Sequence, residues 1–323
     1  MRGRGEDSNA RPKTWAPHLM GRLALALLIL ATLAGCGVAG AGALGIRQPS
    51  SDRAMVVLSA NQPQTSLHPV KTLTAPGFSA SAAYLVNVDT GQVYLAYHAD
   101  DERAMASTTK IMTAMVALTF GKLDQRITVG ADAPAIISQG ASVAGLVQGD
   151  TLTLHDLLYA LLLPSGDDAA IAIADGVAGS QARFIALMND EAALLGLWHT
   201  HYNDVHGLDA SQHYTTARDL ARLALFAMRD PTFAAIVKTP TYSVQGYTWN
   251  TTNLLLTNTD YYTGATGVKT GYTGNAGPCL VFAAIRNGRH LLGVLLGEPN
   301  ATGEALRFTD ATALLNWGFA QPK

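Results

Sequence analysis

Cysteine is scarce in this sequence, since its 323 residues contain only Cys36 and Cys279. Neither residue lies at metal-ligand spacing from another cysteine or from a histidine. A disulfide framework and a cysteine-based zinc site are therefore not expected, and any chemistry has to come from other side chains.

Charge is also sparse, because only 14% of the residues are charged and the formal net charge is -2. Acidic and basic residues are mixed, so the chain lacks the basic field typical of proteins that bind nucleic acid. Apolar residues make up 48% of the chain, which is enough to bury one sizeable domain or two small ones. We therefore expect a globular protein with no nucleic-acid partner.

The N-terminal segment has the pattern of an export signal. An apolar run from Leu23 to Leu33 follows a group of basic residues: Arg2, Arg4, Arg11, Lys13 and Arg22. The run closes on Leu33-Ala34-Gly35-Cys36, which resembles the bacterial lipobox, whose cysteine is lipidated and becomes the mature N-terminus. Residues 1–36 are therefore interpreted as an export signal, with Cys36 as the membrane anchor.

Two alternatives for this segment stay open. Residues 23–46 carry no charge before Arg47, and their length is close to the roughly 20 residues that span a bilayer, so the segment could remain as an uncleaved span. Ordinary cleavage near Ala43 is the other alternative. All three interpretations place the rest of the chain outside the cytoplasm, and the first two attach it to the outer face of the cytoplasmic membrane.

The remaining chain divides into a tether and a folded region. Residues 37–77 include a stretch rich in Ser, Gln and Pro without sustained periodicity, which is typical of a flexible tether. The folded region, 78–321, begins with a predicted β-hairpin whose strands are 83–88 and 93–97.

The folded region continues with a mostly helical stretch and ends in further strands. The stretch 107–230 contains apolar runs at 111–118, 154–163 and 181–195, and Thr216 precedes a further helix as a cap. Strands then return after residue 240. They include a second hairpin, 279–285 with 290–296, which turns at Asn287-Gly288, and the amphipathic stretch 305–319 predicts a final helix. The predicted fold class is α+β, with one antiparallel sheet built from both chain ends around an inserted helical region.

Ser107-Thr108-Thr109-Lys110 is the first of three short motifs that together suggest chemistry. An apolar helix follows Ser107, so Lys110 lies one turn further on and its amine can reach the serine hydroxyl. A serine is a poor nucleophile until a neighbouring base takes its proton, and a lysine can do so only when its amine is neutral. Burial and a second cation both favour the neutral amine, and Lys269 is the candidate second cation. The backbone N–H of Ser107 would also face a developing oxyanion.

The other two motifs are Ser165-Gly166-Asp167 and Lys269-Thr270-Gly271. Ser165 follows the helix breaker Pro164, so we expect it in a tight loop that presents its hydroxyl. On a strand beside the nucleophile, the Lys269 amine could attract a substrate carboxylate and the Thr270 hydroxyl could orient it. Gly271 would let a substrate backbone approach closely.

The three motifs in this order resemble those of the serine D-alanyl-D-alanine carboxypeptidases, the low-molecular-mass penicillin-binding proteins. The resemblance covers about 78–319 and extends to several further segments: Pro164-Ser165-Gly166, His206-Gly207-Leu208-Asp209, Thr216-Ala217-Arg218-Asp219, Val268-Lys269-Thr270-Gly271-Tyr272-Thr273 and Leu314-Leu315-Asn316-Trp317-Gly318-Phe319. It implies a β-lactamase/transpeptidase-like fold. It also implies removal of the terminal D-alanine from peptidoglycan stem peptides through an acyl-enzyme, without a metal or cofactor, and covalent inhibition by β-lactams.

The resemblance also implies a role for each site residue. Ser107 would be the nucleophile, Lys110 its base and Ser165 a proton relay. The backbone N–H groups of Ser107 and Tyr272 would form the oxyanion hole. Lys269 and Thr270, with Arg307 as a further candidate, would hold the terminal carboxylate of the substrate.

The chain departs from the family at two places. The third position of the middle motif is Asp167, where the family usually has asparagine, and an ionised carboxylate cannot donate a hydrogen bond to a substrate carbonyl. Asp167 could also pair with Lys110 and keep it protonated, so the hypothesis is an activity that is slower or shifted to higher pH. The second departure is at the end, where Lys323 closely follows the catalytic region, so the C-terminal β-domain of many relatives is not expected.

Two rival functions follow from these departures. A non-catalytic or slow penicillin-binding or peptidoglycan-binding protein would result if Asp167 abolished turnover, although Ser107, Lys110 and Lys269 are intact. A β-lactamase of the same fold would need a Glu-positioned water, and no convincing Glu-x-x-x-Asn loop follows the middle motif. A serine–histidine mechanism is not expected, because the resemblance makes His206 part of a structural loop and a Ser-Lys mechanism needs no histidine.

Overall fold

The computed structural model describes residues 74–257, 260–299 and 305–322. The expected export signal and most of the expected tether, including Cys36, lie outside the described residues. No single described helix has the length and apolar composition of a membrane span; only α4 and α5, taken together as a sharply bent pair, meet that test.

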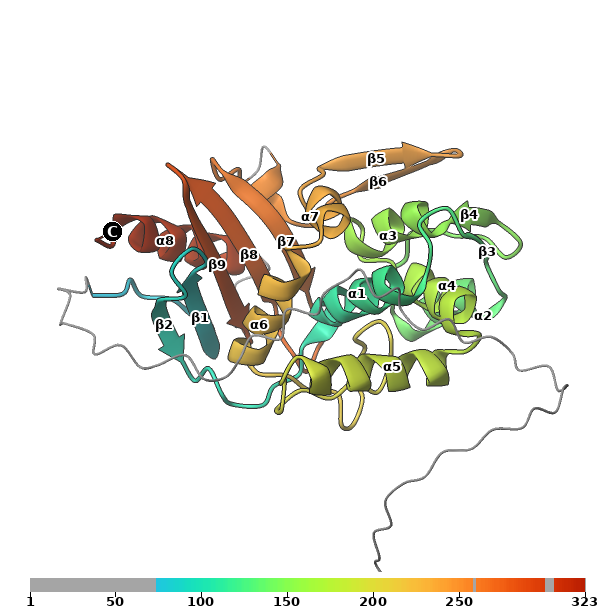
Figure 1. Ribbon diagram of the computed structural model, residues 1–323, viewed down its shortest axis with the longest axis horizontal. Helices are drawn as coiled ribbons and strands as arrows, with labels where there is room; N and C mark the ends of the chain where they lie inside the picture. The colour runs from blue at the N-terminus through green and yellow to red at the C-terminus, as the bar shows by residue number, and fades with distance from the viewer. Residues whose placement is uncertain (1–73, 258–259, 300–304, 323) are drawn as a thin grey trace, which may run out of the picture. The chain divides into compact units, whose positions relative to one another are not determined.

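A five-stranded antiparallel sheet in the order β2-β1-β9-β8-β7 organises the described chain (Figure 1). Its strands come from both ends of the folded region: β1 (Ala82–Asn87), β2 (Val93–Tyr97), β7 (Ala265–Gly271), β8 (Cys279–Arg286) and β9 (Arg289–Leu296). Ala82 pairs with Leu296, so the first strand lies beside the last. The predicted α+β class and the sheet built from both chain ends are confirmed.

Both predicted hairpins are present. The β1–β2 hairpin begins and ends within a residue of its predicted bounds. The β8–β9 hairpin turns at Asn287 and Gly288, with φ values of 51° and 73°. A type I′ turn needs positive φ at both central residues, which asparagine and glycine tolerate.

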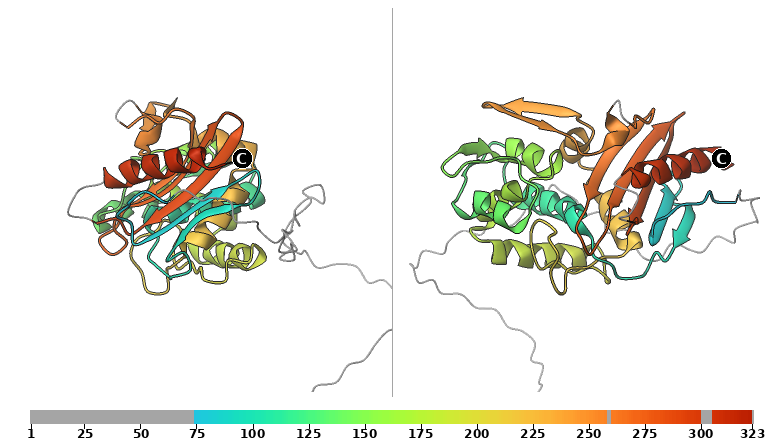
Figure 2. Two further views of the ribbon diagram at one scale, coloured as in Figure 1. Left: turned by 90° about the vertical axis from the view of Figure 1, so that its left-hand side faces the viewer. Right: turned by 180° about the vertical axis from the view of Figure 1, so that it is seen from behind.

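The sheet is covered on both faces because its central strands are apolar on both sides. Leu291 and Leu295 of β9 pack in one cluster with Leu314 and Trp317 of α8 (Leu306–Ala320). The alternate residues of β9 face the other cluster, where α6 (Ala217–Ala227) packs. Figure 2 shows α8 running across the sheet face that is turned away in Figure 1.

The inserted region between β2 and β7 is mainly helical, as predicted. Its elements are η1 (Ala106–Thr109), α1 (Lys110–Phe120), β3 (Arg126–Thr128), α2 (Asp132–Ala135), η2 (Ile136–Gln139), β4 (Thr151–Thr153), α3 (Leu154–Leu162), α4 (Asp167–Ala178), α5 (Gln181–Leu194), α6, α7 (Pro231–Val237), β5 (Thr241–Val244), β6 (Tyr247–Asn250) and η3 (Leu254–Leu256). The short pair β3 and β4 was not predicted, because three residues per strand leave too little alternation to recognise.

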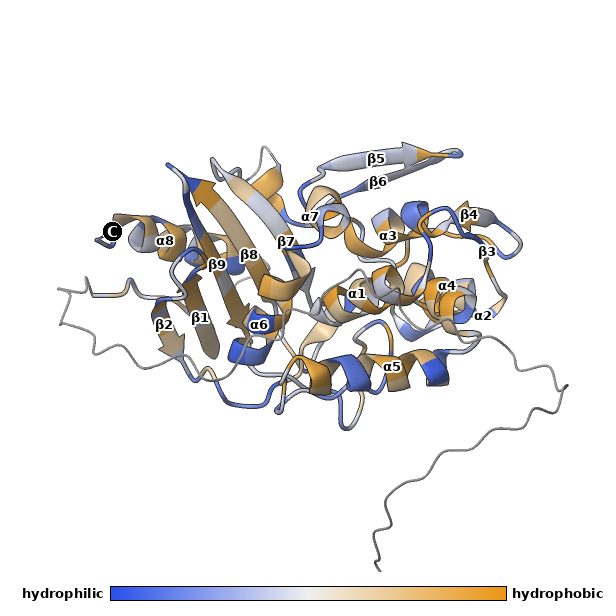
Figure 3. Cartoon of the chain, in the orientation of Figure 1, coloured by the Kyte–Doolittle hydropathy of each residue, from blue (hydrophilic) through white to orange (hydrophobic). Residues whose placement is uncertain are grey.

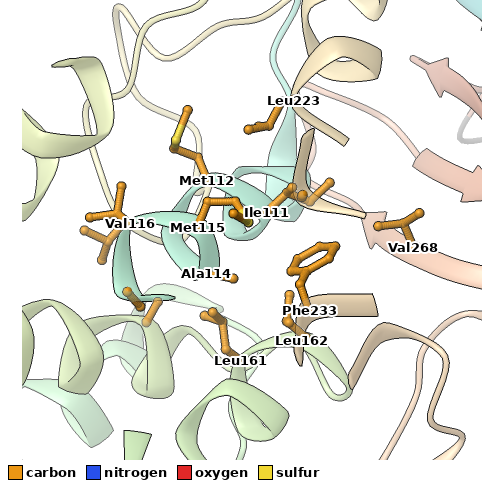
Figure 4. Close-up of a cluster of buried hydrophobic side chains, with 14 of the residues drawn as sticks. Ile111, Met112, Ala114, Met115, Val116, Leu161, Leu162, Leu223, Phe233 and Val268 are labelled. Atoms are coloured by element: carbon orange, nitrogen blue, oxygen red, sulfur yellow. The ribbon is translucent and has the colours of Figure 1, made fainter. Parts of the chain in front are cut away.

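Helix α1 is the centre of this region. Every residue from Lys110 to Leu118 is buried, so the helix is apolar on all sides rather than amphipathic. Figure 4 shows its Ile111, Met112 and Met115 packed among side chains of neighbouring elements, namely Leu161, Leu162, Leu223, Phe233 and Val268. The hydropathy colouring in Figure 3 shows the apolar character of α1 and of much of the sheet, whereas β7 is paler. The start of α1 is therefore fixed in position by packing from several directions.

Side-chain caps fix where several helices begin. Thr153 accepts a hydrogen bond from the Asp156 backbone N–H, and the Asp156 carboxylate bonds back, so α3 starts at a full capping box. The predicted cap Thr216 accepts the N–H of Asp219 at 3.1 Å. The Asp219 carboxylate does not return that bond and instead accepts N–H of His199, which ties the loop before α6 to the helix.

Gly293 tests how tightly the sheet packs. It pairs with Phe282 across β8 and β9, and a Cβ on Gly293 would lie 2.2 Å from Cζ of the Phe282 ring. Gly293→Ala is expected to lower the free energy of unfolding by about 1–3 kcal/mol, because the buried ring has no room to move. Urea unfolding followed by far-UV circular dichroism measures it.

Gly274→Ala is the matched control, since a Cβ there has no neighbour within 4 Å. Equal midpoints for Gly293→Ala and the unmodified protein would show that the ring can relax.

Candidate active site

Ser107 lies in the single turn of η1 that leads directly into α1. The turn begins at Ala106, whose φ of 48° is in the left-handed region that residues with a Cβ rarely adopt. Two hydroxyls hold it: Thr108 Oγ1 donates to Met105 O at 2.6 Å, and Thr109 Oγ1 donates to Ala106 O at 2.8 Å. Strained backbone that is held this firmly is characteristic of functional sites.

Lys110 is the first residue of α1 and is fully buried. Its Nζ donates to Ser107 Oγ at 2.8 Å and to the backbone O of His206 at 2.7 Å. It also forms an ion pair with Asp167 Oδ1 at 2.5 Å. The two groups do not have the angles of a hydrogen bond. The predicted contact between Lys110 and Ser107 is therefore present, and so is the ion pair expected for Asp167.

Ser165 and Asp167 lie in the tight loop between α3 and α4, as predicted. Ser165 has a φ of 68° and is 5% exposed. Its Oγ has no hydrogen-bond partner in the described part of the chain, so the hydroxyl is available to a bound molecule. The Asp167 backbone N–H donates to Ser142 O at 2.7 Å, which fixes the start of α4 against the loop before β4.

Asp168 performs a different task from its neighbour. Its carboxylate accepts backbone N–H groups of Ala144 at 2.8 Å, Leu146 at 3.0 Å and Ala169 at 2.8 Å. It therefore orders the loop that Asp167 touches and faces away from Lys110.

Strand β7 carries Lys269, Thr270 and Gly271, all buried. The Lys269 Nζ donates to Thr270 O at 3.0 Å, and the Thr270 hydroxyl lies 2.5 Å from the hydroxyl of Thr252. Burial lowers the pKa of Lys269 well below its ordinary range, and the nearby charges of Lys110 and Arg307 lower it further. A substrate carboxylate placed beside Lys269 would restore its charge.

Gly271 is required for the approach of β7 to the nucleophile. A Cβ at Gly271 would lie 3.1 Å from Ser107 N and 3.1 Å from Cβ of Ala106. This close approach places the end of β7 directly against the Ser107 turn. Tyr272 follows directly at the strand end and is half exposed, so its backbone leaves the sheet next to Ser107.

Arg307 reaches the site from α8. It is 3% exposed, and its Nη1 donates to Gly271 O at 2.9 Å. Its guanidinium also lies over the Phe308 ring, 5.0 Å from the centroid. In this structure Arg307 holds the end of β7 through its hydrogen bond to Gly271 O, and it adds positive charge near Lys269.

The loop 204–213 closes the site on the side of α1. A Cβ at Gly207, whose φ is 100°, would lie 2.1 Å from Ala106 O. His213 Nε2 lies 2.7 Å from the Thr109 hydroxyl, so the same loop also touches the Ser107 turn through a side chain. Thr273 Oγ1 donates to Asp209 Oδ1 at 2.6 Å, which ties the loop to the chain after β7.

The structure joins Ser107, Lys110 and Asp167 by direct contacts, and it brings Gly271, to which Arg307 donates, against the Ser107 turn. Ser165 lies two residues before Asp167, and Cys36 lies outside the described residues. Sequence reasoning missed Thr252 and His213, as well as the carbonyl of His206. A backbone carbonyl leaves no signal in a sequence, and Thr252 lies outside every motif. The residues His155, His199 and His201 contact Tyr159, Glu102 and Tyr214, respectively, and none of them contacts Ser107.

No group of three or more His, Cys, Asp or Glu side chains is arranged to hold a metal ion within 74–257, 260–299 and 305–322. Cys279 is buried and its pKa is raised to about 11 by burial, so it is a poor candidate nucleophile.

Comparisons with known proteins agree with this geometry. Residues 69–300 match the model of the peptidase S11 family, described as D-alanyl-D-alanine carboxypeptidase. The chain is 40% identical to a D-alanyl-D-alanine carboxypeptidase of Streptomyces sp. over 78% of its own length and 91% of the relative. It is 39% identical to DacC of Escherichia coli over 77% of its own length, but spans only 63% of that protein.

Solved structures give the same result. The crystal structure of the Streptomyces K15 DD-transpeptidase has a TM-score of 0.72 and 38% identity, covering 77% of this chain and 100% of that one. A D-alanyl-D-alanine carboxypeptidase from Mycobacterium tuberculosis has a TM-score of 0.72 and 32% identity, covering 79% and 97%. The β-lactamase/transpeptidase-like fold is confirmed.

Gly207→Ala tests the loop that holds the nucleophile turn. The added Cβ would push Ala106 O and move Ser107, and a displacement of about 1 Å is expected to slow acylation of Ser107 by benzylpenicillin at least about 100-fold. Stopped-flow or gel-based acylation measures the rate.

Gly140→Ala is the control, because Gly140 also has a positive φ of 75° but has open space around it. That variant is expected to lose some stability and keep the acylation rate. Comparable acylation losses in both variants would assign the effect to backbone strain in general.

Proposed function

Because this chain belongs to the D-alanyl-D-alanine carboxypeptidase family, we propose that it removes the terminal D-alanine from peptidoglycan stem peptides through an acyl-enzyme on Ser107. The observation that carries the proposal is the 2.8 Å contact between Lys110 Nζ and Ser107 Oγ. This contact lies next to a strand whose buried Lys269 and Thr270 can receive a carboxylate.

The first half of the reaction forms the acyl-enzyme. The substrate carboxylate binds at Lys269 and Thr270, which aligns the last peptide bond with Ser107. Ser107 Oγ attacks the carbonyl carbon of the penultimate D-alanine while its proton leaves toward Lys110. The backbone N–H groups of Ser107 and Tyr272 stabilise the oxyanion. The C–N bond then breaks, and the hydroxyl of Ser165 passes a proton to the departing amine.

The second half of the reaction releases the shortened peptide. Water attacks the ester carbonyl, and Ser107 regains its proton by the reverse path. β-Lactams mimic the D-alanyl-D-alanine end, so they acylate Ser107 and leave slowly.

Transpeptidation is the second candidate activity. The supporting observation is the 0.72 TM-score to a protein described as a DD-transpeptidase. In that reaction the amine of a second peptide takes the place of water.

Ser107-dependent release of D-alanine tests the main proposal. We expect the fragment from residue 60 onward to release D-alanine from a diacyl-D-alanyl-D-alanine peptide, and the Ser107→Ala variant to lose at least about 1,000-fold in rate, because Ser107 carries the hydroxyl that contacts Lys110 Nζ. Free D-alanine is assayed with D-amino-acid oxidase.

Adding glycine as an amine acceptor separates the two activities. A peptide that ends in glycine would show transpeptidation. Fluorescent penicillin that labels Ser107 while neither product forms would indicate a binding protein.

We also propose that the chain is exported and attached to the outer face of the cytoplasmic membrane through a lipid on Cys36. The support is the sequence Leu33-Ala34-Gly35-Cys36 after a basic segment and an apolar run. A lipid gives an anchor without a spanning helix, although one acyl chain alone binds weakly.

Metabolic labelling with radioactive palmitate tests this anchor. The full-length chain produced in a bacterium that processes lipoproteins is expected to carry the label, and Cys36→Ser is expected to lose it, because serine forms no thioether. Cys279→Ser, the change at the other cysteine, is the control and should keep the label. Membrane retention of unlabelled Cys36→Ser would favour an uncleaved span instead.

A further inference from the structure

Lys110 has the environment of a charged ammonium. Its Nζ donates hydrogen bonds to Ser107 Oγ at 2.8 Å and to His206 O at 2.7 Å, and it forms an ion pair with Asp167 Oδ1 at 2.5 Å that lacks hydrogen-bond geometry. A neutral amine would need a free lone pair to act as a base. Lys110 therefore has to release one proton before it can accept the proton of Ser107.

Asp167 is the one of these three partners that can take that proton. The His206 carbonyl does not ionise in this range, and Ser107 is itself the proton donor. The Asp167 side chain is 3% exposed, so its carboxylate is held at Lys110 away from bulk water.

The Asp167 carboxylate has few other reasons to stay ionised. Within the described residues no backbone N–H or other side-chain donor forms a hydrogen bond to it. The carboxylate of Asp168 accepts three backbone N–H groups by contrast. Asp167 lacks hydrogen bonds of that kind, and its Oδ1 has no hydrogen-bond partner within the described residues.

We propose that Asp167 is the terminal proton acceptor of acylation, and that Lys110 passes protons between Ser107 and Asp167. The inference rests on the proposed function, because it concerns the acylation of Ser107. It replaces the expectation that the Asp167 carboxylate opposes the role of Lys110.

The proton balance is complete without another reactant. As Ser107 Oγ forms its bond to the carbonyl carbon, one proton moves from Lys110 Nζ to Asp167 Oδ1, and the Ser107 proton moves to Lys110. The carbonyl π electrons move to the oxyanion. When the C–N bond breaks, its electron pair stays on nitrogen, and the proton returns from Asp167 through Lys110 and the Ser165 hydroxyl to that nitrogen. The acyl-enzyme then again has a charged Lys110 and an ionised Asp167.

Several ionisable groups surround the relay. Lys269 on β7 and Arg307 on α8 are the basic groups on the sheet side, and burial together with the charges of Lys110 and Arg307 lowers the pKa of Lys269. On the loop side are Asp204, His206 and His213, and burial lowers the pKa of both histidines. Both histidines are therefore neutral above about pH 6.5, the ordinary pKa of histidine. Their titration does not change the acylation rate above that pH. Asp168 is the remaining acid, turned toward backbone N–H groups.

The pH dependence of acylation by benzylpenicillin tests the relay. In Asp167→Asn, Lys110 has to lose its proton to solvent. We therefore expect the pH below which the second-order acylation rate constant falls, the acid limb of its pH profile, to rise by at least about one unit. The rate at pH 7 should then fall at least about 10-fold.

Two further measurements make the result decisive. Asp167→Glu keeps a carboxylate and is expected to keep the low-pH limb even if its rate falls, which a purely structural role would not predict. Circular dichroism confirms that each variant folds.

The outcomes are distinct. An acid limb that moves down, or a faster rate at pH 7, would mean that Asp167 merely holds Lys110 protonated and would overturn the relay. An unchanged profile in Asp167→Asn would overturn it as well. Normal penicillin acylation without D-alanine release from peptide would contradict the proposed function and leave the relay standing. Absence of acylation in the unmodified protein would refute both.

Discussion

The contact of a fully buried lysine with both a serine hydroxyl and a carboxylate is the constraint on which this site depends. An ammonium without water needs acceptors on several sides, and here each acceptor comes from a different segment of the chain. Ser107 comes from η1, Asp167 from the start of α4 and the carbonyl of His206 from the loop before α6. The apolar packing of α1 holds the lysine in place, two hydrogen bonds orient its Nζ, and the ion pair with Asp167 links it to the start of α4.

The sheet adds a second lysine with a different task. Lys269 lies on β7 with only a backbone carbonyl as its described hydrogen-bond partner, and its pKa is lowered by burial and by neighbouring cations. A group that gains its charge when an anion arrives is suited to select substrates with a free carboxylate. The two lysines therefore have different roles. Lys110 transfers protons, and Lys269 binds the carboxylate of the substrate.

Much of this arrangement could be predicted from the sequence, because the strongest signals were local. The strand-like runs 83–88 and 93–97 and the Asn287-Gly288 turn predicted two hairpins, and the spacing of Ser107 and Lys110 predicted one contact. The short strands β3 and β4 and the hydroxyl contact of Thr252 could not be predicted, because three-residue strands and long-range polar contacts leave no periodic pattern. The close approach of Gly271 to the Ser107 turn could not be predicted either, since only the folded backbone shows it.

The pairing of β1 with β9 has a consequence for how the chain reaches its native state. Tyr84 faces Val294 across two adjacent strands, so the sheet cannot be completed until nearly the whole folded region has been synthesised. The inserted helices can pack before the sheet is complete, because α1, α3, α4 and α5 contact one another within a shorter stretch of sequence. Contacts between distant residues cost more loop-closure entropy and form more slowly. The site likewise cannot be completed before strand β7 meets the turn η1 that carries Ser107.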